Sequence, residues 1–270
     1  KTPGDTFSFT TQGEQAIFRQ YEDSALPPGD GSVVVSASGK VGAVVQIQAR
    51  DGQTPTSGAY SGATSGAAQV RIPLVIKDLA SASGTVNSQI VVQNTTGSAV
   101  TVEIDVIKPD GTVQTTKNAG SVAKGASYEY DLSDDGNVPS GFFGSAVARA
   151  TNTGGQIAAI SNLFSGANGM QVFNGFTSTA SQWLVPLFTS RLANGLSTPI
   201  AVQNASGGTI GVGQIVVTCK KDVNSPGAAT ITLNNTTAVL NTAAYFFNPV
   251  TDTTNIPAQW FGSCTVSSGG

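Results

Sequence analysis

Residues 62–74 read GATSGAAQVRIPL, and residues 175–187 read GFTSTASQWLVPL. Both stretches belong to a longer ungapped run, in which residues 31–76 match residues 144–189 at 13 of 46 positions, always 113 positions apart. Internal similarity at a fixed spacing is the sequence signature of a repeat architecture. We therefore expect the chain to be built from copies of one structural unit of about 113 residues.

The repeat divides the chain into three parts. One unit is complete and covers residues 71–182. The next copy covers residues 183–270 and stops before the counterpart of residues 156–178, so we expect it to lack its last strands. Residues 1–70 match only the second half of a unit, after a short leading segment. The sequence thus predicts a partial, a complete and a shortened repeat domain in that order.

This division predicts unfinished sheets at both ends of the chain. Unpaired strand edges are templates on which another chain can add a strand. The leading segment Thr6–Thr10 reads TFSFT, and its alternation puts Phe7 and Phe9 on one face of a short strand. We expect these residues to form a subunit interface by completing the last domain of a second copy, which gives an open head-to-tail polymer. The alternative is a segment of a longer covalent array.

Strand signals recur at short intervals through the complete unit. Most alternate apolar and polar residues, as in Val102–Val106 and Tyr128–Leu132, which is the period of a half-buried strand. Turns rich in Gly, Asn and Asp separate them, and no stretch carries a helical stripe. The pattern predicts an all-β fold of tandem immunoglobulin-like antiparallel β-sandwiches. The expected strands are 70–77, 88–94, 100–108, 111–116, 127–132, 144–150, 156–162 and 170–177.

Five motifs support a resemblance to a known kind of repeat. They are Pro73-Leu-Val75, Ile200-Ala-Val-Gln-Asn204, Pro109-Asp-Gly111, Phe142-Phe-Gly-Ser-Ala-Val147 and Asn174-Gly-Phe176. The unit resembles the tandem β-sandwich repeats of large extracellular surface proteins of filamentous green non-sulfur (Chloroflexota-type) bacteria. The resemblance covers nearly the whole chain, and none of its motifs is chemically unique. It implies an extracellular structural role and carries no catalytic residues.

Composition excludes several classes of function. Charged residues make up 11% of the chain, with 13 basic and 16 acidic residues and a net charge of −3, so there is no basic stripe for nucleic acid. No run approaches the roughly 18 apolar residues of a membrane-spanning helix, and we expect no membrane insertion. A hydrophobic content of 39% is too high for general disorder. The balance is typical of a secreted or cell-surface protein.

The two cysteines, Cys219 and Cys264, both lie in the last repeat. Each sits in an expected strand, and an even count in a secreted-looking chain favours a disulfide. The alternative is a pair of buried thiols. A bridge would brace the unit that lacks its final strands.

The sequence offers few candidate catalytic residues, because the chain contains no histidine. Histidine-based nucleophilic triads and imidazole metal ligands are therefore excluded. Adjacent carboxylates occur only as they do in any turn-rich protein. We expect the protein not to be an enzyme and to need no cofactor.

One acidic turn resembles the first half of a calcium loop. Asp131, Ser133 and Asp135 take the first, third and fifth positions, and Gly136 takes the sixth. The bidentate glutamate expected at position twelve is absent, because Phe142 stands there. A solvated turn is the simpler interpretation, and calcium held by Asp131, Ser133 and Asp135 is the alternative.

Surface modification and surface contacts are the last candidates. Four Asn-x-Ser/Thr sequons begin at Asn94, Asn204, Asn234 and Asn235, and all four are glycosylation candidates. Asn94 and Asn204 are repeat-equivalent, so a shared turn role is an alternative for them. Trp260, next to the C-terminal end, is a candidate for the subunit interface, with ordinary burial as the alternative.

Taken together, these patterns predict a structural subunit of an extracellular filament or surface layer, with further copies of itself as its partner. The alternative function is a carbohydrate- or surface-binding adhesin module from a longer tandem-repeat protein, with glycans as partners. That alternative requires an exposed aromatic platform or a metal-bridged sugar site.

Overall fold

The structure, a computed structural model, describes residues 17–20, 31–48, 57–81, 84–165 and 169–269. Strands joined by turns and loops make up these residues, and no α-helix occurs among them. All strand pairs within the sheets are antiparallel, as is typical of hairpin-connected β-structure. The prediction of an all-β fold is confirmed.

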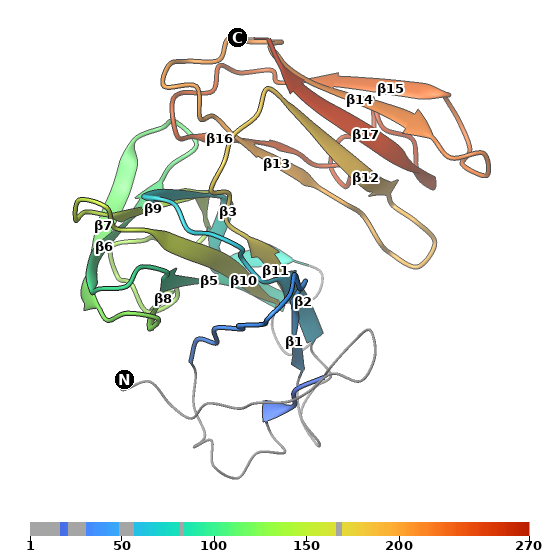
Figure 1. Cartoon of the computed structure of the whole chain (residues 1–270). Coiled ribbons are helices and arrows are strands. Elements are labelled where there is room, and N and C mark those ends of the chain that lie inside the picture. The colour runs from blue at the N-terminus through green and yellow to red at the C-terminus, as the bar shows by residue number, and fades with distance from the viewer. Residues whose placement is uncertain (1–16, 21–30, 49–56, 82–83, 166–168, 270) are drawn as a thin grey trace.

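The central domain consists of two sheets packed face to face (Figure 1). One sheet has the order β3 (Gln69–Lys77), β9 (Phe142–Ala150), β6 (Val100–Ile107) and β7 (Val113–Val122). The other has the order β11 (Gly169–Asn174), β10 (Ile157–Ser165), β5 (Gly84–Asn94) and β4 (Leu79–Ser81), with β8 (Ser127–Asp131) also paired to β5. Alternate apolar residues from both sheets, such as Ile72 and Ile90, are fully buried between them.

The C-terminal domain repeats this plan with fewer strands. Its larger sheet has the order β12 (Gln182–Ser190), β17 (Trp260–Ser268), β14 (Ile215–Lys221) and β15 (Thr230–Asn234). Its smaller sheet holds only β13 (Ile200–Gln203) and β16 (Ala244–Phe247). The core between them is centred on Phe188, Ile215 and Trp260 and shares no residue with the central core.

The strand orders of the two domains correspond to each other. The order β12-β17-β14-β15 matches β3-β9-β6-β7, and β13-β16 matches β5-β8. The described C-terminal domain has no counterpart of β10 and β11. Before the central domain, β1 (Val44–Gln48) and β2 (Ser57–Ser61) form a separate antiparallel hairpin.

The expected strands of the central unit are all present, with ends that differ by a few residues. The largest differences are at β5, which begins at Gly84 rather than Ser88, and at β7, which runs on to Val122. The three-residue strand β4 was not predicted, because so short a segment carries no alternation to detect.

Candidate assembly surface

One strand edge of the C-terminal domain is unpaired. In the central domain, β5 lies between two partners: β10 along Val86–Asn94 and β8 along Gln89–Gln93. In the C-terminal domain, β13 pairs with β16 alone, and no described strand pairs with its other edge. The backbone groups along that edge face the position that β10 occupies in the central domain. Such an edge is a template for strand addition.

Apolar side chains are exposed beside this edge. Trp183, Leu184 and Leu187 of β12, here called the β12 apolar strip, have exposed fractions of 39%, 75% and 59%. Their repeat counterparts in β3 are better covered: Val70 in place of Trp183 is 0% exposed. Sequence analysis did not identify Leu184 and Leu187, although the missing strands of the last repeat were the signal that could have found them.

The contacts of β3 explain the difference in exposure. After β11, the chain folds back over β3, where Arg71 and Phe176 exchange backbone hydrogen bonds of 2.9 and 2.8 Å. Gly175 lies so close to Val70 that an added Cβ would be 2.4 Å from Cγ1 of Val70. No described segment makes the equivalent contacts over β12. Trp183 is thus exposed at a position where its counterpart Val70 is covered in the central domain.

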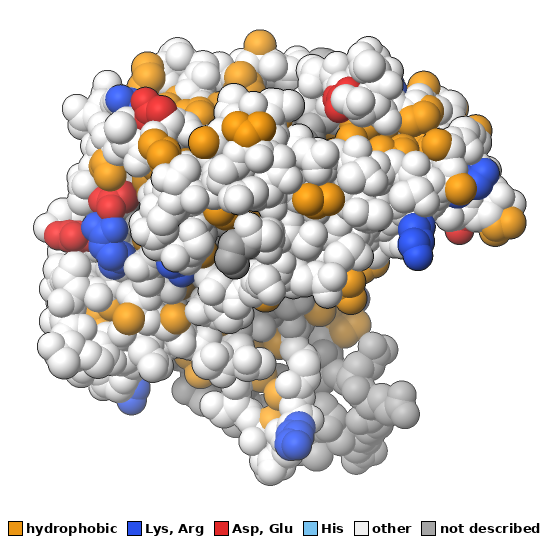
Figure 2. All heavy atoms as spheres, turned by 90° about the horizontal axis from the view of Figure 1, so that it is seen from above, with side chains coloured by type: hydrophobic (Ala, Val, Ile, Leu, Met, Phe, Trp, Pro, Cys, Tyr) orange, Lys and Arg blue, Asp and Glu red, His pale blue; other side chains and the backbone are white. Residues whose placement is uncertain are grey.

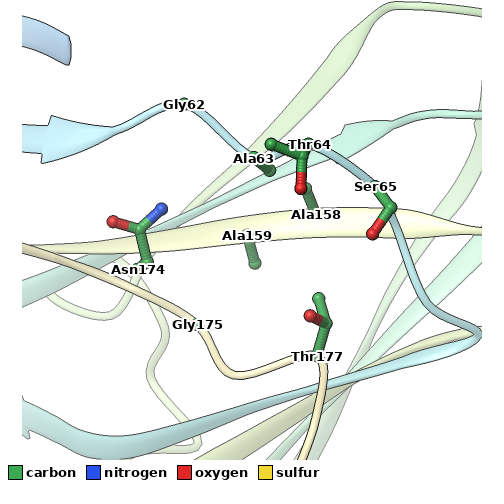
Figure 3. Close-up of a pocket in the computed structure, with 9 residues that line it drawn as sticks. All are labelled: Gly62, Ala63, Thr64, Ser65, Ala158, Ala159, Asn174, Gly175 and Thr177. Atoms are coloured by element: carbon green, nitrogen blue, oxygen red, sulfur yellow. The ribbon is translucent and has the colours of Figure 1, made fainter. Parts of the chain in front are cut away.

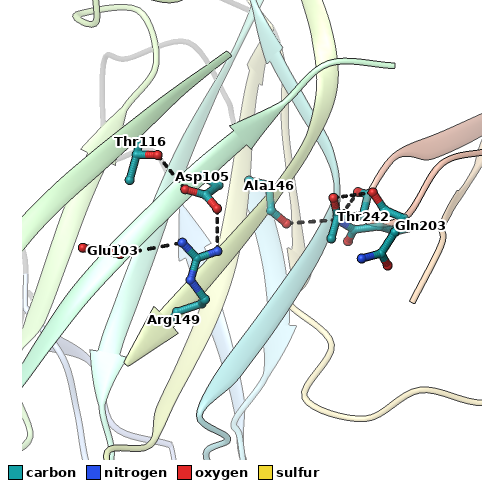
Figure 4. Close-up of polar contacts among 8 residues, drawn as sticks. Glu103, Asp105, Thr116, Ala146, Arg149, Gln203 and Thr242 are labelled. Atoms are coloured by element: carbon teal, nitrogen blue, oxygen red, sulfur yellow. Dashed lines mark hydrogen bonds and ion pairs between the residues drawn. The ribbon is translucent and has the colours of Figure 1, made fainter. Parts of the chain in front are cut away.

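The junction between consecutive units is built twice in the same way. The Ser145 hydroxyl donates to the Thr242 carbonyl oxygen across the boundary of the central and C-terminal domains, at 2.8 Å. One repeat earlier, the Ser32 hydroxyl donates to the Gly125 carbonyl oxygen. Gln203 adds hydrogen bonds from its amide to the carbonyl oxygens of Ala146 and Thr242 (Figure 4). Ser32 therefore contacts the central domain as Ser145 contacts the C-terminal domain.

The β1–β2 hairpin contacts the central domain mainly through β2, which lies against β11. The Asn174 side chain of β11 donates to the Ser61 carbonyl oxygen at 2.7 Å and accepts from the Ser61 amide, and Gly58 lies against Val172. Strand β2 therefore faces β11, and the outer edge of β1 has no described partner. Val44 and Val45 of β1 are 74% and 37% exposed.

Two hollows lie on the surface of the described chain. The first, of about 200 Å³, is lined by small side chains, and it brings the repeated segments Gly62–Ser65 and Asn174–Thr177 together over β10 (Figure 3). No residue that lines it is titratable. The second, of about 430 Å³, lies beside β16 and is lined by Tyr245, Phe247, Asp252 and Asn255 among others.

The predicted calcium residues form a hydrogen-bonded turn after β8. The Asp131 carboxylate accepts from the backbone amide and the hydroxyl of Ser133. The Asp135 carboxylate, buried in the described structure, accepts from the Tyr130 hydroxyl at 2.8 Å and from the amides of Asn137. No group of three or more His, Cys, Asp or Glu side chains able to hold a metal occurs among the described residues.

The hydrogen bond between Tyr130 and Asp135 in this turn affects the pKa values of both side chains. Burial alone would raise the pKa of Asp135, but the hydrogen bonds from Asn137 and Tyr130 outweigh it and lower the pKa. Burial, helped by the hydrogen bond to Asp135, raises the pKa of Tyr130. Asp135 thus stabilises the turn as a carboxylate.

The two cysteines are joined. Cys219 of β14 and Cys264 of β17 face each other across neighbouring strands and form a disulfide.

The structure bears on only one of the three residues predicted for the subunit interface. Phe7 and Phe9 lie outside the described residues. Trp260 is fully buried, donates its indole N–H to the Ala228 carbonyl oxygen and packs edge-to-face against Phe188, so the prediction of an interface role for Trp260 is wrong.

Three of the four sequons are unsuited to glycosylation. Asn94, Asn204 and Asn235 are at most 1% exposed, and each side-chain amide donates to two backbone carbonyl oxygens. The prediction that these three asparagines are glycosylation sites is therefore wrong, because their side chains are buried and hydrogen-bonded. Asn94 and Asn204 fill the same place in their turns, as the alternative of a shared turn role anticipated. Asn234, at the end of β15, is exposed and keeps its candidacy.

Charges are sparse and partly neutralised by each other. Arg149 of β9 contacts Asp105 of β6 and lies 3.6 Å from Glu103 (Figure 4). The hydrogen bond from Arg149 to Asp105 raises the pKa of the guanidinium further. The face seen in Figure 2 is mostly uncharged, with apolar side chains scattered over it.

Comparisons with known proteins do not assign the chain to a family. No protein-family profile and no curated protein matches it. Among solved structures, the Thermotoga maritima protein 1070 covers 43% of this chain and 98% of its own, with 13% identity and a TM-score of 0.34. Red sea bream transglutaminase covers 74% of this chain and 31% of its own, with 11% identity and a TM-score of 0.16. Similarities this weak carry no argument about fold or function.

None of the described residues forms a helix that is both long and apolar enough to cross a membrane.

Proposed function

We propose that the protein is a structural subunit of an extracellular filament or surface layer, which assembles head to tail by pairing a strand of one copy with an unpaired strand edge of the next. It acts as a mechanical building block and not as an enzyme. The observation that carries the proposal is the unpaired edge of β13 next to the β12 apolar strip. Burial of these side chains by a second copy would stabilise the contact by roughly 25 cal/mol for each Å² of apolar surface covered.

Other features support this role. A disulfide suits an oxidising compartment outside the cell. The repeated junction, Ser32 to Gly125 and Ser145 to Thr242, is a unit-to-unit contact that further units can continue. The resemblance to repeats of bacterial surface proteins, and with it the immunoglobulin-like arrangement, agrees with the same role.

Negative-stain electron microscopy of the purified chain, after dissociation and return to native buffer, tests the proposal. We expect filaments whose axial repeat equals two to three sandwich lengths. A second sample lacking residues 1–12 tests whether the predicted Phe7–Phe9 strand takes part in the contact: loss of filaments, with the central domain still folded by circular dichroism, would assign the contact to that strand. Uniform monomers of the complete chain would overturn the filament proposal, and filaments of normal length after the deletion would remove Phe7 and Phe9 from the contact.

A second candidate function is supported by the hollow beside β16. Its lining of Tyr245 and Phe247 with Asp252 and Asn255 combines aromatic faces and polar groups, as sugar-binding sites do. A carbohydrate- or surface-binding adhesin module would use such a site. A glycan array probed with the monomer separates the two functions: selective binding that is lost in Tyr245→Ala would favour the adhesin, and an empty array would leave the structural role alone.

A further inference from the structure

We propose that the β1–β2 hairpin of one copy completes the C-terminal domain of a second copy, with β1 added along the open edge of β13. This inference rests on the proposed assembly by strand pairing and names both of its surfaces. The intermolecular sheet would have the order β2-β1-β13-β16. That order repeats β11-β10-β5-β8 of the central domain, strand for strand.

The repeat identifies the hairpin as the counterpart of β10 and β11. At the spacing of 113 residues, β1 corresponds to the first half of β10, and β2 falls on β11. In the central domain these two strands lie beyond β5, β10 contacts β3, and Gly175, just after β11, lies against Val70. The described chain therefore carries an uncovered groove in one domain and, near its other end, a hairpin of the kind that fills the same groove elsewhere.

The hairpin has the two-sided character that such a position requires. Val45, Ile47 and Tyr60 share one face, because Val45 pairs with Tyr60 and residues two apart in a strand point the same way. The opposite face carries Gln46, Gln48 and the serines of β2, together with Val44 and Ala59. Docked on β13 with this face inward, Val45, Ile47 and Tyr60 would lie toward Trp183 of β12, the counterpart of the buried Val70.

Neither surface carries the usual protection against strand addition. Natural edge strands are commonly blocked by charged residues. Strands β1, β2, β12 and β13 contain no charged residue. In contrast, β7, the outer edge strand of its sheet, carries Lys117.

The geometry favours a second copy over the same chain as the donor. In Figure 1, β1 and β2 lie below the central domain, whereas the C-terminal domain lies above it. Strand β2 is held against β11 through Asn174, so the outer edge of β1 points away from its own central domain. The backbone groups along the outer edge of β1 are therefore available to a second copy. The face of Ile47 and Tyr60 lies toward Val172 of its own β11, on the evidence of Gly58, so docking that face on a second copy would replace this contact.

Disulfide trapping between two variants of the full chain, each with one added cysteine, tests the contact. The central domain pairs β10 with β5 in a known register. With the apolar face of β1 turned inward, Gln48 would lie opposite Ala201; with the ungapped repeat register, Ile47 would lie opposite Ala201. Residues opposite each other in antiparallel strands have Cα atoms roughly 4.5–5.5 Å apart, which a disulfide can span.

Ala201→Cys is mixed with Gln48→Cys, and separately with Ile47→Cys, under mild oxidation. The matched control mixes Gln48→Cys with Val223→Cys, because Val223 is 87% exposed and lies in the loop after β14, away from the groove. The native cysteines are already paired, so each variant adds one free thiol. We expect one Ala201 mixture to give on the order of tenfold more linked dimer than the control, because docking raises the effective concentration of the thiols. Thermal melting of each variant checks that it is folded.

The outcomes separate this inference from the filament proposal. Linked dimer at the control level in both Ala201 mixtures overturns the hairpin contact, and filaments seen by microscopy in that case keep the proposed function and place its contact elsewhere. Linked dimer well above the control without filaments supports the hairpin contact and overturns the filament, because the assembly then closes on itself.

Discussion

Buried asparagines close the same turn in both domains. The Asn204 side chain donates to the carbonyl oxygens of Gly208 and Val239 and accepts from the amide of Ser206. Removing the side chain takes one hydrogen bond from the buried Val239 carbonyl, which keeps its bond from the Ile210 amide, and also removes the bonds to Gly208 and Ser206. We expect Asn204→Ala to destabilise the C-terminal domain by roughly 1–3 kcal/mol, measured by urea unfolding.

Two further variants control this prediction. Asn94→Ala removes the equivalent bonds to Ser98 and Val122, so it should destabilise the central domain by a similar amount. Asn234→Ala, at an exposed position, should change stability by less than about 0.5 kcal/mol. Equal stability of Asn204→Ala and the intact chain would show that the turn does not depend on the amide.

The Asp135 turn predicts a pH dependence at the same scale. Hydrogen bonds hold the folded pKa of Asp135 below its ordinary value, so the charged form is stabilised by folding. Its contribution is fully present above the unfolded pKa of about 4 and is lost as pH falls through the lower folded pKa. Urea unfolding of the intact chain and of Asp135→Asn, measured from about pH 5 downward, should converge at the acidic end. A stability difference that stays constant across that range would contradict the prediction.

At the scale of a strand, each domain has a glycine at the same position of its central strand, where the neighbouring strand and an aromatic ring leave no room for a side chain. An added Cβ at Gly144 of β9 would lie 2.1 Å from the Ile107 carbonyl oxygen and 2.8 Å from the Phe142 ring. Gly262 of β17 has the same surroundings, with Lys220 and the Trp260 ring in those places. The aromatic side chain two residues earlier therefore lies over the glycine in both domains. This explains the physical content of the repeated Phe-Gly-Ser motif.

The consequence is a position that tolerates no side chain. We expect Gly144→Ala to destabilise the central domain by roughly 1–3 kcal/mol, because the ring or the paired strand must move. Gly97→Ala is the matched control, since an added Cβ there meets nothing within 4 Å. The comparison is made by thermal unfolding, and equal melting temperatures of the two variants would mean that β9 accommodates the methyl group without strain.

Strand positions could be predicted from the sequence, whereas the burial of individual side chains such as Asn235 and Trp260 could not. Alternation marks a strand such as β6 because one face must be buried, and the repeat located β10 and β11 as the elements without a counterpart. The sequence could not show that Asn235 is buried, because a sequon looks the same in an exposed loop and in a closed turn. The same limit applies to Trp260, whose neighbours across the sandwich come from distant parts of the chain.

At the scale of the whole molecule, the described chain holds two separate cores. The central core and the C-terminal core share no residue, and the boundary between them rests on a few contacts, including the Ser145–Thr242 hydrogen bond and the edge-to-face pair Phe143–Phe246. Two cores joined by a small boundary are expected to unfold in two steps, because domains unfold together only when they bury a large surface against each other. Calorimetry of the dissociated chain should therefore show two transitions.

Reduction of the disulfide should move only one of these transitions. The Cys219–Cys264 bridge closes a loop with a sequence separation of 45 within the C-terminal domain, and such loops contribute roughly 3–4 kcal/mol in the chain-entropy model. For a domain of this size, that loss corresponds to a fall in melting temperature of about 10–25 °C. The central transition should stay in place, because none of its core residues contacts the bridge cluster. A single transition that shifts as a whole would mean that the boundary couples both domains into one cooperative unit, so that a partner bound at β13 would stabilise the entire chain.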